Sequence, residues 1–121
     1  ERPEDILRKF KKAVTDSEAC VRFDPEQKPG VSNLMQIYAV CTGKTFDAIE
    51  AEFAGRGYGE FKGAVGEAVV ETLRPIRGET ERILADKTYL EGIYRAGAER
   101  AAYVAGKTLR KVYKKVGFVE R

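Results

Sequence analysis

Histidine is absent from this chain of 121 residues, and cysteine occurs only twice, as Cys20 and Cys41. Without histidine no side chain has an unperturbed pKa near neutrality, so acid–base catalysis would need a strongly shifted carboxylate or lysine. No motif points to such a group, and the two cysteines lack the spacing of a zinc site. We therefore expect no catalytic residue and no metal site. We expect both cysteines to be reduced, with Cys41 buried on a helix.

Long apolar runs are also missing. No run approaches the ~18 residues that a membrane-spanning helix needs. The stretch 1–10 is charged and lacks the apolar segment of a secretory signal, which predicts a cytoplasmic protein. Hydrophobic residues make up 43% and charged residues 34% of the chain, a composition that excludes a disordered tail. The length suits a single domain over 1–121.

The periodicity of apolar residues predicts an all-α fold, a compact helical bundle of about five helices with a long ordered loop after the first. The loop, 15–30, contains the turn-forming pairs Asp24-Pro25 and Pro29-Gly30. Ser32 and Thr45 are predicted N-caps, and Pro75 is predicted to kink the fourth helix. The expected helices are 3–14, a second from Ser32 to Gly43, a short third after Thr45, a fourth over 60–84 and a fifth over 88–116.

Several short motifs follow one another in a defined order along nearly the whole chain. They are Ala13-Val14-Thr15-Asp16-Ser17, Arg22-Phe23-Asp24-Pro25, the stretch 28–34, the stretch 50–62, the stretch 70–76 and Gly97-Ala98-Glu99-Arg100-Ala101. The succession resembles the segment after the signature loop of bacterial tryptophanyl-tRNA synthetases, which are class I enzymes. This resemblance implies the C-terminal helical domain of the family, which binds the tRNA anticodon.

The family's ATP-binding tetrapeptide and its lysine-containing loop do not occur among these residues. The resemblance therefore implies either a domain of a larger synthetase or a free-standing relative, inactive by itself and without a cofactor. ATP and Mg²⁺ would serve the whole enzyme. The implied partners are tryptophan tRNA and the synthetase catalytic domain, in a homodimeric full enzyme of which this segment can be a monomer.

Base recognition is expected near the start of the loop. The tryptophan anticodon has two adjacent cytosines, whose exocyclic amino groups a carboxylate such as Asp16 can accept. The alternative is that Asp16 caps its own turn. Tyr58, between glycines, is the better candidate for stacking on a base, whereas Phe23 and Phe61 are predicted to be core residues. Lys62 and Arg74 are carried over from the family because they match its positions on the fourth helix. The expected anticodon-binding residues are therefore Thr15, Asp16, Ser17, Tyr58, Lys62 and Arg74.

Phosphate contacts are expected to supply most of the affinity for RNA. The segment 107–121 has six basic residues against one acidic residue, in a chain whose net charge is +3. The alternative is that these cations offset the helix dipole. The expected phosphate-binding residues are Arg22, Lys28, Lys107, Arg110 and Lys111. A second interpretation of the whole chain is a protein-interaction module that lost RNA binding and uses Glu50, Glu52 and Glu60.

Overall fold

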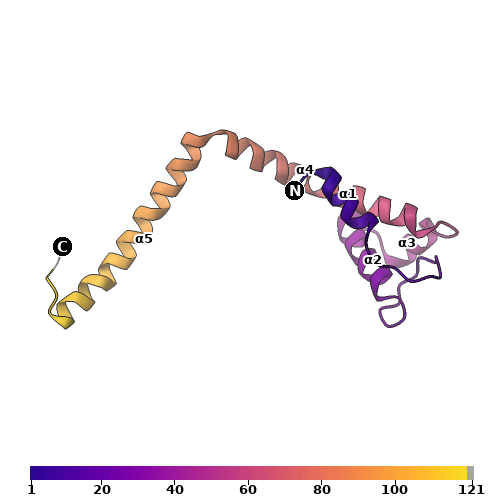
Figure 1. The fold of residues 1–121 in the computed structure, drawn as a ribbon, viewed down its shortest axis with the longest axis horizontal. Helices are drawn as coiled ribbons and strands as arrows, with labels where there is room; N and C mark the ends of the chain where they lie inside the picture. The colour runs from indigo at the N-terminus through magenta and orange to yellow at the C-terminus, as the bar shows by residue number, and fades with distance from the viewer. Residues whose placement is uncertain (120–121) are drawn as a thin grey trace. The chain divides into compact units, whose positions relative to one another are not determined.

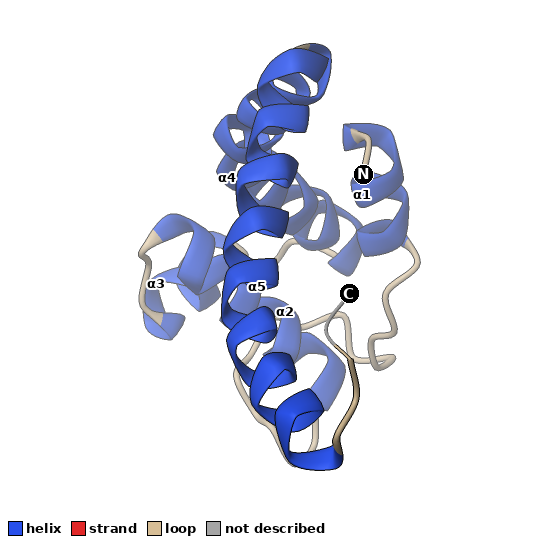
Figure 2. Ribbon diagram, turned by 90° about the vertical axis from the view of Figure 1, so that its left-hand side faces the viewer, coloured by secondary structure: helices blue, strands red, loops and turns tan. Residues whose placement is uncertain are grey.

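The structure, a computed structural model, describes residues 1–119 (Figure 1). Its helices are α1 (Pro3–Lys11), α2 (Pro29–Thr42), α3 (Phe46–Glu52), α4 (Tyr58–Ala85) and α5 (Lys87–Val116). None of the described residues lies in a strand, as Figure 2 shows, so the predicted all-α fold of about five helices is confirmed. No described helix combines the length and the apolar character that crossing a membrane requires.

Backbone contacts divide the chain into two units, Glu1–Arg77 and Gly78–Arg121, and the single domain over 1–121 stays a prediction. Every buried apolar side chain of the described chain belongs to the first unit. None of the residues of α5 is buried, and its apolar side chains, such as Leu109 and Val112, are about half exposed. The apolar residues of α5 therefore add no buried side chain to the described structure.

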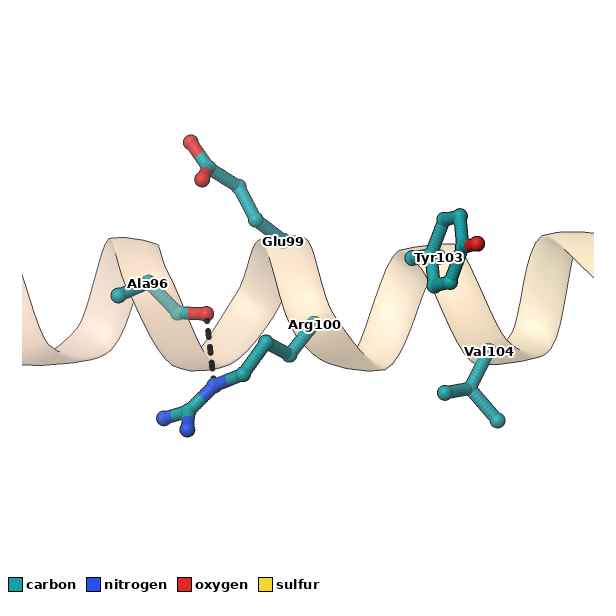
Figure 3. A pocket seen from close by; sticks show the side chains of 5 residues that line it. All are labelled: Ala96, Glu99, Arg100, Tyr103 and Val104. Atoms are coloured by element: carbon teal, nitrogen blue, oxygen red, sulfur yellow. Dashed lines mark hydrogen bonds between the residues drawn. The ribbon is translucent and has the colours of Figure 1, made fainter.

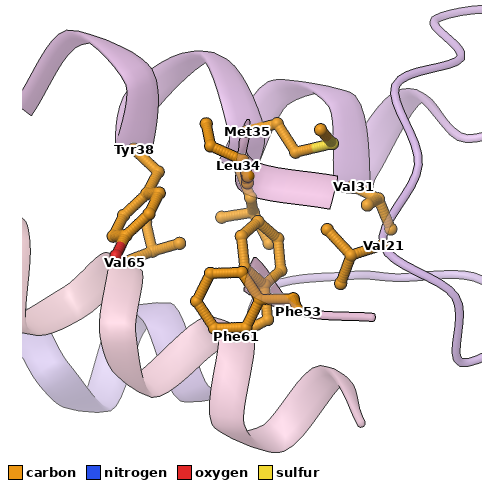
Figure 4. Packing of buried hydrophobic residues seen from close by; sticks show 9 residues of the cluster. Val21, Val31, Leu34, Met35, Tyr38, Phe53, Phe61 and Val65 are labelled. Carbon is orange, nitrogen blue, oxygen red and sulfur yellow. The ribbon is translucent and has the colours of Figure 1, made fainter. Parts of the chain in front are cut away.

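The core of the first unit is built around aromatic side chains from α2, the end of α3 and α4 (Figure 4). Phe61 is fully buried, and its ring meets those of Phe53 and Tyr38 edge-on at centroid distances of 5.0 and 6.3 Å. Such edge-to-face contacts are favourable for rings of this size. Phe61 is a core residue as predicted, and Phe23 packs against the core while stacking on Phe46.

The bounds of α1, α2 and α4 differ from prediction. Helix α1 ends at Lys11 instead of residue 14, and α4 begins at Tyr58 instead of residue 60. Helix α2 begins at Pro29, so Ser32 is not its N-cap; the buried Ser32 hydroxyl accepts a hydrogen bond from the Asp24 N–H instead. Cys41, which was predicted to be buried, is half-buried. The Thr45 cap of α3 is confirmed by the hydrogen bond from the Ala48 N–H.

Residues 12–28, the connecting loop, pass close to the first turn of α2. A Cβ atom at Gly30 would collide with the carbonyl oxygen of Val14, so only glycine lets the two backbones approach this closely. The loop is also tied to α3, because the Phe23 N–H donates to Glu50 Oε1 at 2.8 Å. These contacts hold the connecting loop against the core.

Candidate nucleic-acid interface

Lys28, at the end of the connecting loop, is only 1% exposed. Its ammonium lies 2.6 Å from Glu18 Oε2 and 3.2 Å from Asp16 Oδ1. It also donates to the Tyr58 hydroxyl at 3.2 Å and to the Cys20 carbonyl at 3.3 Å. We call Lys28, Asp16, Glu18 and Tyr58 the lysine cluster. It joins three points of the loop to the first residue of α4.

The protonation of the lysine cluster follows from these contacts. Hydrogen bonding by Tyr58 lowers the pKa of Asp16 to about 2 against the opposing effect of burial, with further help from the Glu18 N–H and from Lys28. Burial disfavours the charged form of Lys28, but its bonds with Glu18, Tyr58 and Asp16 outweigh it and raise the pKa. Both groups are therefore charged at neutral pH, and the cluster contains an ion pair.

Asp16 faces the protein. Its Oδ1 accepts from the Tyr58 hydroxyl at 2.6 Å and from the Glu18 N–H at 2.9 Å, the pattern of a side chain capping its own turn. Its Oδ2 is buried and has no partner among the described residues. Because neither oxygen is open to an incoming base in this conformation, the geometry favours the turn-capping alternative over cytosine recognition by Asp16.

Lys28 and Tyr58 are likewise engaged internally. The ammonium of Lys28 is enclosed by protein acceptors and is not free for an RNA phosphate in this conformation, so its assignment to phosphate binding stays a prediction. The Tyr58 hydroxyl is bonded within the cluster and its ring is half-buried, with the Lys28 ammonium 5.9 Å from the ring centroid. The assignment of Tyr58 to base stacking stays a prediction.

The other predicted site residues of the first unit lie in the connecting loop and on α4. Thr15 is half-buried and Ser17 is exposed, on either side of Asp16. Arg22 is 49% exposed and pairs with Asp24 at 3.0 Å. On α4, Lys62 is half-buried, whereas Arg74 is 71% exposed and pairs with Glu71 at 2.5 Å. Nothing in the geometry tests their assignment to the anticodon, which stays a prediction.

The basic segment of α5 has two distinct sides. At 100° per residue, its cations fall on one side of the helix and Ala105, Leu109, Val112 and Val116 fall on the other. The cations are exposed, and they are Lys107, Arg110, Lys111, Lys114 and Lys115; we call them the cationic face. Glu120 and Arg121, which the sequence prediction included, lie outside the described residues. Lys107 lies 4.1 Å above the Tyr103 ring, a cation–π contact.

The same helix has a shallow hollow lined by Ala96, Glu99, Arg100, Tyr103 and Val104, whose side chains are drawn in Figure 3. All five residues belong to α5, and Arg100 bonds only to the Ala96 carbonyl, one turn earlier. A hollow between side chains of one helix has no opposite wall that could enclose a ligand. We therefore regard it as part of the α5 surface.

Of the three carboxylates named for the protein-interaction alternative, Glu50 and Glu52 form close contacts with other residues of this chain. Glu50 accepts from the Phe23 N–H, and Glu52 accepts from the Tyr38 hydroxyl while pairing with Lys44 at 2.7 Å. Only Glu60, whose side chain is 66% exposed, has a loose pairing with Arg56 at 3.9 Å. No group of three or more metal-ligating side chains occurs among the residues that the structure describes.

Sequence reasoning missed Glu18 and underestimated Glu50. Glu18 forms the shortest contact to Lys28, and Glu50 anchors the connecting loop on α3. Both contacts join residues that come together only when the loop folds, so no local sequence motif predicts them. The spacing of Glu50 along α3 shows only that it is not on the stripe of Phe46, Ile49 and Phe53.

A profile of the family described as "tRNA synthetases class I (W and Y)" matches residues 1–74 of this chain. Among curated proteins, the tryptophan–tRNA ligase of Clostridium tetani is 50% identical over 117 residues, which are 97% of this chain and 34% of the relative. That of Wolinella succinogenes is 48% identical over 117 residues, 97% of this chain and 35% of the relative. The chain thus spans about a third of the length of these relatives.

A solved structure is also similar. The tryptophanyl-tRNA synthetase of Mycoplasma pneumoniae superposes on the chain with a TM-score of 0.66 and 26% sequence identity. The match covers 98% of this chain and 36% of that protein. Similarity in sequence and similarity in structure therefore point to the same group of proteins.

Proposed function

The chain belongs to the class I tRNA synthetases of the tryptophan and tyrosine type, and from this premise we propose that it is the C-terminal, tRNA-binding part of a tryptophan–tRNA ligase. In this proposal the chain holds the anticodon arm of the tRNA. Aminoacylation, with its ATP and Mg²⁺, takes place in a part of the enzyme other than these 121 residues.

The observation that carries the proposal is the 50% identity to a tryptophan–tRNA ligase over 97% of the chain. A match over almost every residue includes the loop, α4 and the cationic face of α5. The sequence identity therefore favours the same function as the relative for this whole segment, because it is not limited to one short motif.

Electrostatics gives the proposal its physical basis. The cationic face presents exposed cations to the solvent over little more than two turns of one helix, and no described carboxylate pairs with them. RNA binding by such a surface is driven by the release of counterions from the phosphates, so it depends on salt and little on sequence. Recognition of particular bases must then come from the first unit.

The proposal is tested by measuring the binding of the chain to an anticodon stem-loop at several salt concentrations. Replacing Lys107, Arg110 and Lys111 together with glutamine should weaken binding to every loop sequence. Because each phosphate contact releases nearly one counterion, the slope of log K against log salt should become shallower by about two to three.

The matched control removes three cations that pair with carboxylates inside the fold: Arg2, Lys44 and Arg82, each replaced with glutamine. This control should leave the salt slope nearly unchanged. Binding of the wild-type chain that does not depend on salt, or no binding to any stem-loop, would contradict the proposal and favour a protein-interaction module.

A further inference from the structure

A hollow of about 390 Å³ lies between the connecting loop and the C-terminal end of α3. Its apolar lining includes Val21 and Phe53, which Figure 4 shows at the edge of the core, together with Ala54. Its polar lining consists of Glu50 and Arg22. The volume falls within the usual range of ligand pockets, roughly 300–1,000 Å³, and the lining combines apolar walls with few polar groups as such pockets do.

Glu50 is held in this hollow by one of its two oxygens. Oε1 accepts the Phe23 N–H at 2.8 Å, which fixes the carboxylate against the loop. Oε2 has no hydrogen bond or ion pair with any described residue and is not fully buried. A carboxylate anchored by one oxygen and open at the other is already oriented to accept a hydrogen bond from a ligand.

The loop wall of the hollow contains a strained residue. Ala19 has φ of 56°, in the left-handed region that non-glycine residues rarely adopt. Such strain persists only where surrounding contacts impose it, and it gathers at ligand sites. Here the neighbours impose it, because the Glu18 carboxylate and the Cys20 carbonyl on either side both contact Lys28. The lysine cluster thereby shapes the wall next to Glu50.

From these observations we propose that the hollow binds one unstacked base with an exocyclic amino group, a cytosine of the anticodon loop, and that Glu50 Oε2 accepts that amino group. The base plane lies against the apolar wall of Val21, Phe53 and Ala54. Arg22, at the rim and half exposed, faces the phosphate that follows. The inference rests on the proposed tRNA binding and transfers cytosine recognition from Asp16, whose oxygens are enclosed, to Glu50.

Cytosine presents an amino donor where uracil presents a carbonyl acceptor, so the two bases test the contact directly. The wild-type chain should prefer cytosine over uracil by about tenfold at one of the two adjacent cytosine positions of the stem-loop, the effect of one good polar contact. In Glu50→Gln the amide oxygen can still accept from the Phe23 N–H, but the other atom becomes a donor. This variant should lose the preference for cytosine or reverse it.

The control Asp47→Asn removes one exposed negative charge from the same helix, away from the hollow, and should keep the preference for cytosine. A Glu50→Gln variant with the wild-type preference overturns the inference and leaves tRNA binding standing, as does a wild-type chain that binds both loops equally. A wild-type chain that binds neither loop overturns both proposals.

A second variant covers the case in which Glu50→Gln fails to fold, as judged by circular dichroism. Ala54→Leu fills the hollow from an exposed position of the opposite wall. It should abolish discrimination between cytosine and uracil while the salt dependence stays as in the wild type. Unchanged discrimination in Ala54→Leu overturns the inference.

Discussion

A single buried cation organises the residues around the connecting loop. Lys28 has a short contact with Glu18 and longer ones with Asp16 and Tyr58, so its ammonium is satisfied without water. Removing one partner of such a buried pair leaves the other uncompensated. The motif residues that the sequence suggested as readers of RNA are thus first of all the residues that shape the loop.

The pH dependence of stability should reveal the charge on Asp16. Its pKa is lowered to about 2 in the folded chain, chiefly by the hydrogen bond from Tyr58, compared with ~3.9 for an unperturbed aspartate. A lowered pKa contributes stability that is present above about pH 4 and lost as the pH falls toward about 2. In urea unfolding, Asp16→Asn should be less stable than the wild type at pH 7, and the gap should close between about pH 4 and pH 2. A gap independent of pH would show that the charge contributes nothing.

Two glycines should respond in opposite ways to the same substitution. In Gly30→Ala the new methyl group meets the Val14 carbonyl, so the loop or the first turn of α2 must move, at a cost of about 1–3 kcal/mol of unfolding free energy. Gly63→Ala, in the interior of α4 with open space around it, should gain up to about 1 kcal/mol from helix propensity. Denaturant titrations of both variants measure the two values. Equal effects would mean that the loop does not lie against α2.

At the scale of elements, sequence patterns correctly predicted helix caps and helix ends that depend only on residues nearby in the sequence. Gly43 and Gly117 end α2 and α5 with positive φ, as their positions indicated, and Thr45 caps α3. These features depend on backbone conformation within one turn. The start of α2 was placed at Ser32 because serine favours N-caps, but its hydroxyl instead serves Asp24 in the folded loop. Tertiary hydrogen bonds outweighed a local preference there.

The candidate site was harder to predict because it depends on contacts between distant segments. The sequence singled out Asp16, Lys28 and Tyr58 one by one, and the structure brings all three into one cluster. Their side chains point inward, which no motif spacing reveals. The role of Glu50 follows from a bond across 27 residues and from a hollow that forms only when the loop closes on α3.

At the scale of the whole molecule, the buried apolar core of the described residues 1–119 is confined to the first 77. The apolar residues of α5 recur at helical spacing as core residues do, but periodicity reports only that a side of a helix is apolar, not what covers it. The apolar spacing of α5 could therefore not reveal from the sequence that none of its residues is buried. The stability of the chain should accordingly depend very unevenly on its apolar residues.

Two truncations to alanine measure this difference. Phe61→Ala removes a fully buried ring and should cost about 3–5 kcal/mol of unfolding free energy. Leu109→Ala removes a side chain that is 49% exposed and should change the unfolding free energy by about 0.5 kcal/mol or less. Thermal and denaturant unfolding of the isolated chain provide both values. A large loss in Leu109→Ala would place α5 against the core.

The burial of Lys28 also decides which amines of the folded protein can react. Acylating reagents attack neutral, accessible amines, and Lys28 is enclosed with a raised pKa, whereas the other ten of the eleven lysines are exposed or half-buried. Biotin or a fluorophore attached through lysine therefore reacts with the other lysines and leaves Lys28 unmodified. Surface immobilisation by this chemistry leaves the lysine cluster intact, although it consumes lysines of the cationic face, so a tag at a chain end is the better handle for studying RNA.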